Sequence, residues 1–385
     1  MRRASLSGRP GARAALSLAV AACGLLPAPG CTRRIAKPPA GSKNKAWTEF
    51  AGNPVIKIGD SVPHMLWNDP SVLQEGETYR MWLSGGDPRE GSHVVVQVYE
   101  AESKDGLSWK IDPTPRLRAA PDPAAWDSLR IETPSVVKVG DTYHLYYSGG
   151  SYEAAQAAAL SIGHATSPDG VNWSRDPANP IIARQDRDPH AWGYHGVGEP
   201  GVVYDQKRAT FYLYYVSMRF ATRDPTIGNV GILLATSRDG SHFEDYVDAQ
   251  GQRALVLTRD VENARSGSWF GYSTPSALIA PDGRFHLFCS FIVLPQGPSS
   301  VRYVGLDHAV SPDGLHFEVV ERSILEAGEG DWKDQHVRSP TVVENHGRLE
   351  MWFAGETRKP YFAAGIGFAT REASTPAPER SSPSP

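Results

Sequence analysis

The sequence predicts an all-β fold, a five-bladed β-propeller with four antiparallel strands per blade. Five X-Pro steps recur along the chain at intervals of 64, 66, 75 and 65 residues, and four Ser-x-Asp-Gly turns lie between them. A repeat of this length that recurs along nearly the whole chain indicates one supersecondary unit per repeat. The X-Pro steps are Asp69-Pro70, Thr133-Pro134, Glu199-Pro200, Thr274-Pro275 and Ser339-Pro340, and the turns begin at Ser103, Ser167, Ser237 and Ser311.

Each unit is expected to contain the same four strands in order. The first surrounds the X-Pro step, and the second is an aromatic strand with period-2 alternation, which favours strand over helix. The third runs into the Asp-Gly turn, where Gly tolerates a positive φ and Asp bonds its own backbone. A fourth strand begins at the Trp or Phe after the turn. Five such antiparallel units predict a propeller. The aromatic strands span 79–84, 143–148, 211–217, 285–290 and 349–354.

The last unit stops after its third strand, near 365–370, and has no Asp-Gly turn. A matching outer strand occurs at the other end of the chain, because Asn53-Pro54-Val55-Ile56 resembles Asn179-Pro180-Ile181-Ile182. We therefore expect residues 53–58 to complete the last blade and pair its open edge. A two-sheet sandwich would explain the strand content but not the period.

The N-terminus has the pattern of an export signal. Arginines from Arg2 onward precede the apolar stretch 14–22, which is too short to span a bilayer as a helix. Val20-Ala21-Ala22-Cys23 resembles a bacterial lipobox, which predicts lipidation at Cys23. Cys31 is a second candidate for the anchor, and ordinary secretion is the alternative. The protein is expected to be exported, as an envelope lipoprotein or secreted, with membrane contact through the anchor only.

These patterns divide the chain into four parts. They are a lipoprotein signal peptide at 1–22, a tether at 23–47, the propeller domain at 48–371 and a disordered Ser/Pro tail at 372–385.

Composition narrows the classes of partner. A net charge of −4 and a pI near 6.3 leave no basic stripe, which argues against nucleic acid. Cys289 lies mid-strand and is expected to be a small buried hydrophobe, so no disulfide framework is predicted. Ten Trp and fifteen Tyr residues suit both a propeller core and the sugar rings of a carbohydrate partner, and we expect a monomer.

Candidate catalytic residues cluster at the X-Pro steps. The innermost strand of each blade starts at the central channel, so Asp69, Glu132 and Glu199 are expected to face a common funnel. Glycosidic cleavage needs one ionised carboxylate and one whose raised pKa lets it protonate the leaving oxygen. The alternative role of Asp69 is a strand cap, and that of Glu132 a sideways ion pair with Arg130. The expected substrate-binding residues are Trp67, Asn68, Arg130, His195, Tyr272, His336 and Arg338.

The channel histidines suit either a metal or sugar contacts, but their spacing matches no ligand motif. We therefore expect no cofactor, and leave open a structural Ca²⁺ ion or water in the channel.

A family resemblance adds to this interpretation. Trp67-Asn68-Asp69-Pro70 resembles the signature that opens the first blade of family 32 glycoside hydrolases, the invertase group. The five-blade plan and the turns resemble family 43, the arabinanases and β-xylosidases, and more loosely family 130, the mannoside phosphorylases. The resemblance covers about 50–371. It implies that Asp69 is the base or nucleophile, that Glu199 holds the third-blade acidic position, and that His336 is a channel histidine.

The sequence departs from these families at two steps. Families 32 and 43 place the general acid in the fourth blade, where this chain has Tyr272-Ser273-Thr274 and no carboxylate. Family 130 has Asp-Pro in the second blade, where this chain has Thr133.

We therefore expect a hydrolase of plant or microbial pentose- or fructose-type glycosides, with Asp69 as base or nucleophile and Glu199 as general acid. Glu132, with Arg130, is expected to modulate them. The alternatives are a non-catalytic carbohydrate-binding propeller and a phosphorylase in which Arg130, Arg338 and a histidine bind phosphate. A sialidase-like propeller fits less well, because that group has six blades and a different turn.

Overall fold

The computed structural model describes ten stretches of the chain, and every regular element in them is a β-strand. The predicted signal peptide, Cys23, Cys31, almost all of the tether, and the tail after Glu372 lie outside the described residues. Within those stretches, no helix is long and apolar enough to cross a membrane. The stretches are 47–87, 94–151, 160–185, 187–194, 196–220, 228–258, 269–294, 302–328, 332–357 and 363–372.

The described strands form four hydrogen-bonded sheets, and nearly all of their pairing is antiparallel. The first sheet contains β2 (Leu66–Glu75), β3 (Thr78–Gly86), β4 (Gln97–Ser103) and β5 (Lys110–Ile111). The second contains β6 (Arg130–Val139), β7 (Thr142–Gly150), β8 (Ser161–Ser167) and β9 (Ser174–Arg175). The fourth contains β1 (Thr48–Glu49), β19 (His336–Asn345), β20 (Arg348–Thr357) and β21 (Ala363–Glu372).

The third sheet has nine strands and joins the third and fourth sequence repeats. Its two antiparallel parts are linked by a short parallel ladder between Gly228–Val230 and Trp269–Gly271. Five separate sheets, as the repeat would suggest, are therefore not seen. The sheet contains β10 (Val197–Asp205), β11 (Thr210–Phe220), β12 (Gly228–Ser237), β13 (Glu244–Asp245), β14 (Leu255–Leu257), β15 (Trp269–Ile279), β16 (Phe285–Leu294), β17 (Arg302–Ser311) and β18 (Glu318–Glu326).

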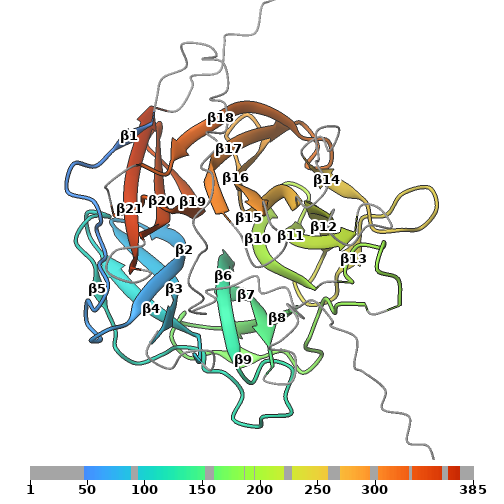
Figure 1. The fold of residues 1–385 in the computed structure, drawn as a ribbon, viewed down its shortest axis with the longest axis horizontal. Coiled ribbons are helices and arrows are strands. Elements are labelled where there is room, and N and C mark those ends of the chain that lie inside the picture. Colours follow the sequence, from blue (N-terminus) through green and yellow to red (C-terminus); the bar gives the residue numbers. More distant parts are fainter. Residues whose placement is uncertain are drawn as a thin grey trace, which may run out of the picture.

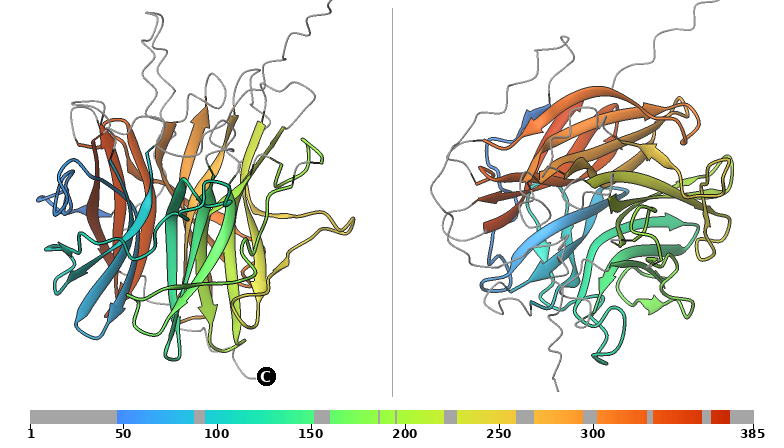
Figure 2. Two further views of the ribbon diagram at one scale, coloured as in Figure 1. Left: turned by 90° about the horizontal axis from the view of Figure 1, so that it is seen from below. Right: turned by 45° about the vertical axis from the view of Figure 1, so that its right-hand side comes forward.

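The sheets are arranged around a central axis and do not stack as the two layers of a sandwich (Figures 1 and 2). The innermost strands are β2, β6, β10, β15 and β19. Each contacts the next one around the axis, and β19 contacts β2. The five X-Pro steps of the sequence lie on these five strands.

Every X-Pro step forms a β-bulge with the same backbone conformation. The residue before each proline has a φ between 45° and 52°, in the left-handed region. The strand register shifts at each step, for example between Asn68 and Ser71. A bulge re-aims side chains, and proline fits there because it cannot donate to the ladder. The repeated step therefore turns one polar side chain per unit towards the axis.

The Ser-x-Asp-Gly turns join neighbouring units. In each turn, the Asp carboxylate accepts two backbone N–H bonds and the Ser hydroxyl accepts the N–H of Gly. The Gly carbonyl then accepts a hydrogen bond from an aromatic side chain of an adjacent unit. These donors are Trp82 to Gly170, Tyr146 to Gly240, Tyr214 to Gly314 and Trp352 to Gly106.

The remaining aromatic position of this series is Phe288, which has no donor to offer. Here the N-terminal segment fills the junction, because Trp47 packs edge-on against Phe288 at 6.0 Å between ring centroids. Trp47 is buried in the same apolar cluster as Val337 and Phe353. The last residue of the predicted tether, Trp47, is therefore part of the folded core.

The N-terminal segment also pairs with the last strand. Asn53 bonds both the C=O and the N–H of Phe368, as Asn179 bonds both groups of His164. Ile56 then bridges Ile366, which lies two residues before Phe368, as expected for a strand that covers this edge. Of the predicted strand 53–58, only Val55 and Ile56 bond to β21 through their backbone, while Thr48–Glu49 form the regular ladder.

Candidate functional site

The innermost strands bring most of the predicted site residues to one end of the channel. Asp69 on β2 contacts Arg338 on β19, and the charges of Asp69, Arg338 and Glu199 all act on Glu132 of β6. Residues from four of the innermost strands therefore share one electrostatic environment. Asn68 is buried beside them, whereas His195 lies outside the described residues.

Asp69 accepts hydrogen bonds from two donors. Its Oδ1 accepts a hydrogen bond from Arg338 Nη1 at 3.1 Å and another from the Ser339 hydroxyl at 2.6 Å. The side chain is only 8% exposed, so these charge-assisted bonds replace water. The left-handed φ of 49° at Asp69 is what turns the carboxylate into the channel.

Arg338 is shared between Asp69 and a carboxylate that the sequence pattern did not predict. Its Nε donates to Glu356 Oε1 at 2.9 Å, and its Nη2 lies 2.9 Å from the same oxygen. His336 Nε2 lies 3.9 Å from the other oxygen of Glu356. Burial alone would raise the pKa of Glu356, but Arg338 and His336 outweigh it and the pKa lies below its ordinary value.

A sequence signal for Glu356 existed. The first two aromatic strands end in Ser-Gly-Gly, whereas the last continues as Ala354-Gly355-Glu356. Glu356 pairs with His336 across the ladder just as Gly86 pairs with Leu66. A carboxylate that replaces a repeated glycine next to the channel marks a departure from the scaffold.

Glu132 is the carboxylate with the least local support. It is 4% exposed, and its Oε1 has no hydrogen-bond partner in the described part of the chain. Burial raises its pKa to about 7. Arg130 opposes this shift, the negative charge of Asp69 adds to it, and Arg338 and Glu199 contribute smaller opposed effects. A carboxyl group with this pKa is partly protonated near neutral pH, which a general acid requires.

Glu199 is buried too, but it is tied to the backbone. Its Oε2 accepts the N–H of Thr274 at 2.9 Å and the hydroxyl of Ser273. Burial raises its pKa, although these two bonds oppose the shift. Glu199 is therefore engaged in holding the fourth X-Pro step.

The equivalent backbone groups at other steps are capped by serines. Ser84 accepts the N–H of Thr133 at 3.0 Å and Ser148 that of Glu199 at 2.7 Å. Ser290 accepts the N–H of Ser339 at 3.2 Å. Glu199 thus does for Thr274 what a serine hydroxyl does elsewhere, which is a scaffold role.

Two of the expected sugar-binding aromatics belong to the core. Trp67 and Tyr272 are both 0% exposed. The indole N–H of Trp67 donates to the Asp60 carbonyl at 3.0 Å, and the Tyr272 hydroxyl donates to Asp307 at 2.8 Å. Neither ring presents a face to a ligand, because both are packed and satisfied internally.

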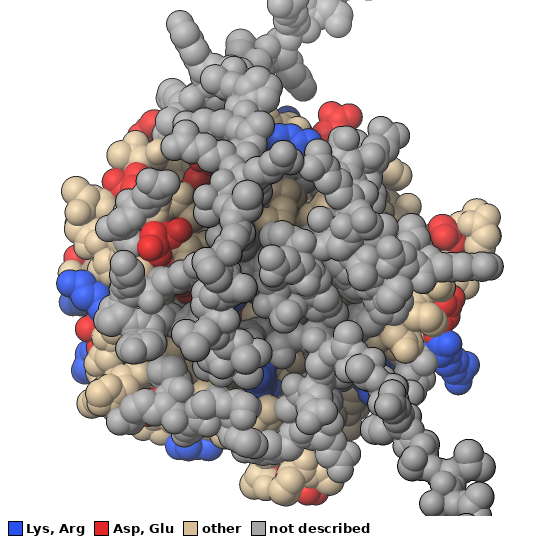
Figure 3. Space-filling view, viewed as in Figure 1, with Lys and Arg blue, Asp and Glu red and all other residues tan. Residues whose placement is uncertain are grey.

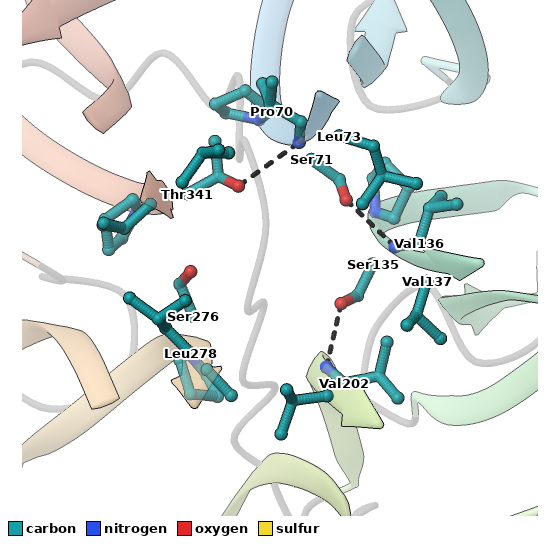
Figure 4. Close-up of a pocket in the computed structure, with 18 of the residues that line it drawn as sticks. Pro70, Ser71, Leu73, Ser135, Val136, Val137, Val202, Ser276, Leu278 and Thr341 are labelled. Atoms are coloured by element: carbon teal, nitrogen blue, oxygen red, sulfur yellow. Dashed lines mark hydrogen bonds between the residues drawn. The ribbon is translucent and has the colours of Figure 1, made fainter. Parts of the chain in front are cut away.

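A cavity of about 500 Å³ continues along the axis, lined by the later residues of the innermost strands (Figure 4). Hydroxyls of Ser71 and Ser135 accept the backbone N–H groups of Val136 and Val202, both at 2.9 Å, and thereby link adjacent strands. Asp69 and Glu199 border this cavity, whereas Glu132 does not. The cavity along the axis is mainly apolar, lined by proline, valine and leucine side chains.

Lysine, arginine, aspartate and glutamate side chains are scattered around the outline of the face drawn in Figure 3, without a patch of one sign. The described stretches hold no group of three or more His, Cys, Asp or Glu residues placed to bind a metal ion.

No family model matches the sequence. An uncharacterized protein of Mycobacterium tuberculosis is 24% identical over 307 residues, which cover 77% of this chain and 89% of that relative.

Solved structures are similar along almost the whole chain. One, described as a complex of BT0996 with RGII, has a TM-score of 0.63 at 15% identity, and the match covers 87% of this protein and 94% of that structure. Another is a member of the GH130 family of mannoside phosphorylases, described as containing hydrolases of β-1,2-mannosidic linkages in Candida mannan. It has a TM-score of 0.61 at 16% identity, covering 88% and 97%.

A thermostable family-43 glycoside hydrolase has a TM-score of 0.54 at 14% identity, covering 79% of this protein and 89% of that structure. At such identities the likeness establishes the fold. The chain therefore has the all-β fold of the propeller glycoside hydrolases and mannoside phosphorylases that its sequence resembles.

Proposed function

We propose that the protein is a carbohydrate-active enzyme, a glycoside hydrolase. Its active site lies on the innermost strands, around the X-Pro steps. One observation carries the proposal. Asp69 is hydrogen-bonded and ion-paired to Arg338, while nearby Glu132 is buried without a described hydrogen-bond partner for Oε1 and has a pKa of about 7. Glycosidic cleavage uses one carboxyl group that protonates the leaving oxygen and a second that acts as base or nucleophile.

In this mechanism Glu132 donates its proton to the glycosidic oxygen as the bond to the anomeric carbon breaks. Asp69 either removes a proton from the attacking water, or attacks the anomeric carbon and forms a glycosyl ester that water then cleaves with Glu132 as base. Product stereochemistry distinguishes the two. Acid–base catalysis by two carboxyl groups requires no cofactor. The contacts of Glu199 with Thr274 and Ser273 favour a scaffold role. We therefore assign the general acid to Glu132 in place of Glu199.

The architecture that fits this site is a five-bladed propeller whose last blade includes the N-terminal segment. Its support is the fivefold repeat of the left-handed X-Pro bulge and the contacts of each innermost strand with the next. The nine-stranded sheet then contains the third and fourth blades.

The proposal includes export as a monomeric lipoprotein anchored at Cys23, supported by the lipobox-like Val20-Ala21-Ala22-Cys23. Its substrates would be plant or microbial saccharides. Pentose and fructose glycosides follow from the sequence resemblance, and mannosides from the described activity of a structural neighbour.

Phosphorolysis is the second candidate, since mannoside phosphorylases share the fold. A phosphorylase needs cationic groups that are free to bind phosphate. Arg338 is already paired with both Asp69 and Glu356, so phosphate would have to compete with two carboxylates for it. Of the two arginines expected to bind phosphate, only Arg130 lacks such a competitor among the described residues, and we take one free arginine to favour water over phosphate as the acceptor.

The test is a screen of the purified protein on pentose, fructose and mannose glycosides, with and without phosphate. Asp69→Asn and Glu132→Gln should each lower turnover by about 100-fold or more while the variants remain folded. Full activity of either variant would remove the proposed catalytic pair. Turnover that depends on phosphate would assign a phosphorylase, and binding without turnover a carbohydrate-binding protein.

A further inference from the structure

Arg130 is a funnel cation that forms no salt bridge with the described residues. Its Nε is buried without a hydrogen-bond partner, and none of the described carboxylates lies within ion-pair distance of its guanidinium. Its cross-strand neighbour on β7 is Gly150, which has no side chain to contact it. The other funnel arginine, Arg338, is by contrast paired on two sides.

Arg130 shares a strand face with Glu132. The two residues are separated by one position on β6, and alternate residues of a strand point to the same side. Glu132 faces the axis, because charges from β2, β10 and β19 act on it. A guanidinium nitrogen and a carboxyl oxygen that lack described partners thus lie next to each other at the funnel.

A buried guanidinium N–H without a partner is costly unless a ligand pairs with it. The planar fork of the guanidinium fits the two oxygens of an oxyanion. We propose that Arg130 binds an oxyanion carried by the ligand, the carboxylate of an acidic sugar residue, and so selects acidic over neutral saccharides. The inference rests on the proposed function for its saccharide, but binding tests it without turnover.

Phosphate would meet the same guanidinium with the same chemistry. The acidic sugar is favoured because, of the two funnel arginines described, Arg338 is already paired and only Arg130 is left for the anion. A dianion beside Asp69 and Glu132 would also be repelled more strongly than a monoanion.

Oxyanion binding should also be linked to a proton. Arg130 is the main charge that lowers the pKa of Glu132, with Arg338 assisting and Asp69 and Glu199 opposing. A bound oxyanion neutralises Arg130, which favours the protonated form of Glu132. Binding of the acidic ligand would thereby keep Glu132 protonated, and Glu132 donates this proton in the reaction.

The experiment measures binding by calorimetry or NMR titration at pH 6 and pH 8.5. The probes are galacturonic acid and glucuronic acid, their neutral counterparts galactose and glucose, and inorganic phosphate. We expect at least one uronic acid to bind about tenfold or more tightly than its neutral counterpart at pH 6, with proton uptake and weaker binding at pH 8.5.

Arg130→Gln should abolish this preference, and Arg130→Lys should restore part of it. Arg284→Gln, on an exposed hairpin, is the matched control and should keep it. Glu132→Gln should keep the preference but lose the dependence on pH. Equal binding of acidic and neutral sugars, or an unchanged preference in Arg130→Gln, would overturn the proposal. If phosphate is the only probe whose binding depends on Arg130, the acidic-sugar proposal is wrong and the subsite is assigned to phosphate.

Discussion

Replacing Glu132 by Gln should make the folded protein more stable at alkaline pH, although it removes the proposed acid. The pKa of Glu132 rises from 4.5 to about 7 on folding, mainly through burial. A raised pKa means that folding favours the neutral form of the carboxyl group. The ionised form therefore destabilises the fold, and Gln, which carries no charge, does not.

The size and pH range follow from the two pKa values. One pKa unit corresponds to about 1.4 kcal/mol, so the full effect is about 3 kcal/mol. It is absent below pH 4.5, grows as the pH rises, and is complete above about pH 7. The stability of the native protein should thus fall with rising pH over this range, relative to that of the variant.

The assay is urea unfolding of both proteins at intervals between pH 4 and 9, with the difference in unfolding free energy plotted against pH. Any constant offset, for example from the buried amide of Gln, is removed by comparing the two ends of the curve. Glu318→Gln, at an exposed position on β18, is the control and should give a flat difference. A flat curve for Glu132→Gln as well would refute the raised pKa and, with it, the acid role.

Three further predictions concern the other carboxylates and the junction at the N-terminus. Asp69→Asn should lower turnover by about 100- to 10,000-fold in a steady-state assay, with substrate binding retained. Glu199→Gln keeps an acceptor oxygen for the scaffold, so the alkaline limb of the pH–rate profile should persist, whereas Glu132→Gln should remove it. Trp47→Ala should lower the unfolding free energy by about 3 kcal/mol in urea, because it empties a buried site against Phe288; a loss below about 1 kcal/mol would show that the segment does not stabilise the fold.

The repeat made the scaffold predictable. The X-Pro step, the aromatic strand and the Asp-Gly turn each have local chemistry that fixes a conformation, and the all-β fold follows from their order. The joining of the third and fourth units into one sheet was not predictable, because it depends on how closely the backbones of β12 and β15 approach each other. Its clearest trace in the sequence is Gly271, where a Cβ would lie 1.8 Å from the carbonyl oxygen of Val230.

The aromatic site residues were not predictable for a different reason. Trp67 and Tyr272 sit next to X-Pro steps, where the polar side chains turn inward, yet both rings pack between strands. An aromatic residue serves core and ligand equally well, and the sequence pattern is the same in both cases. Glu356 was not predicted because it lies on an aromatic strand and not at a step.

Differences among the five X-Pro steps distinguish a structural carboxylate from a functional one. Serine hydroxyls accept the equivalent backbone N–H at other steps, and Glu199 takes that place at the N–H of Thr274. This contact gives Glu199 a structural role. Ser217, the serine expected at this place, instead bonds Gly193 and Gly196. Glu132 replaces nothing of this kind, and its burial without a described partner for Oε1 destabilises the fold. The fold does not require this destabilisation, and a catalytic role for Glu132 explains it most simply. Glu132, and not Glu199, is therefore the better candidate for the general acid.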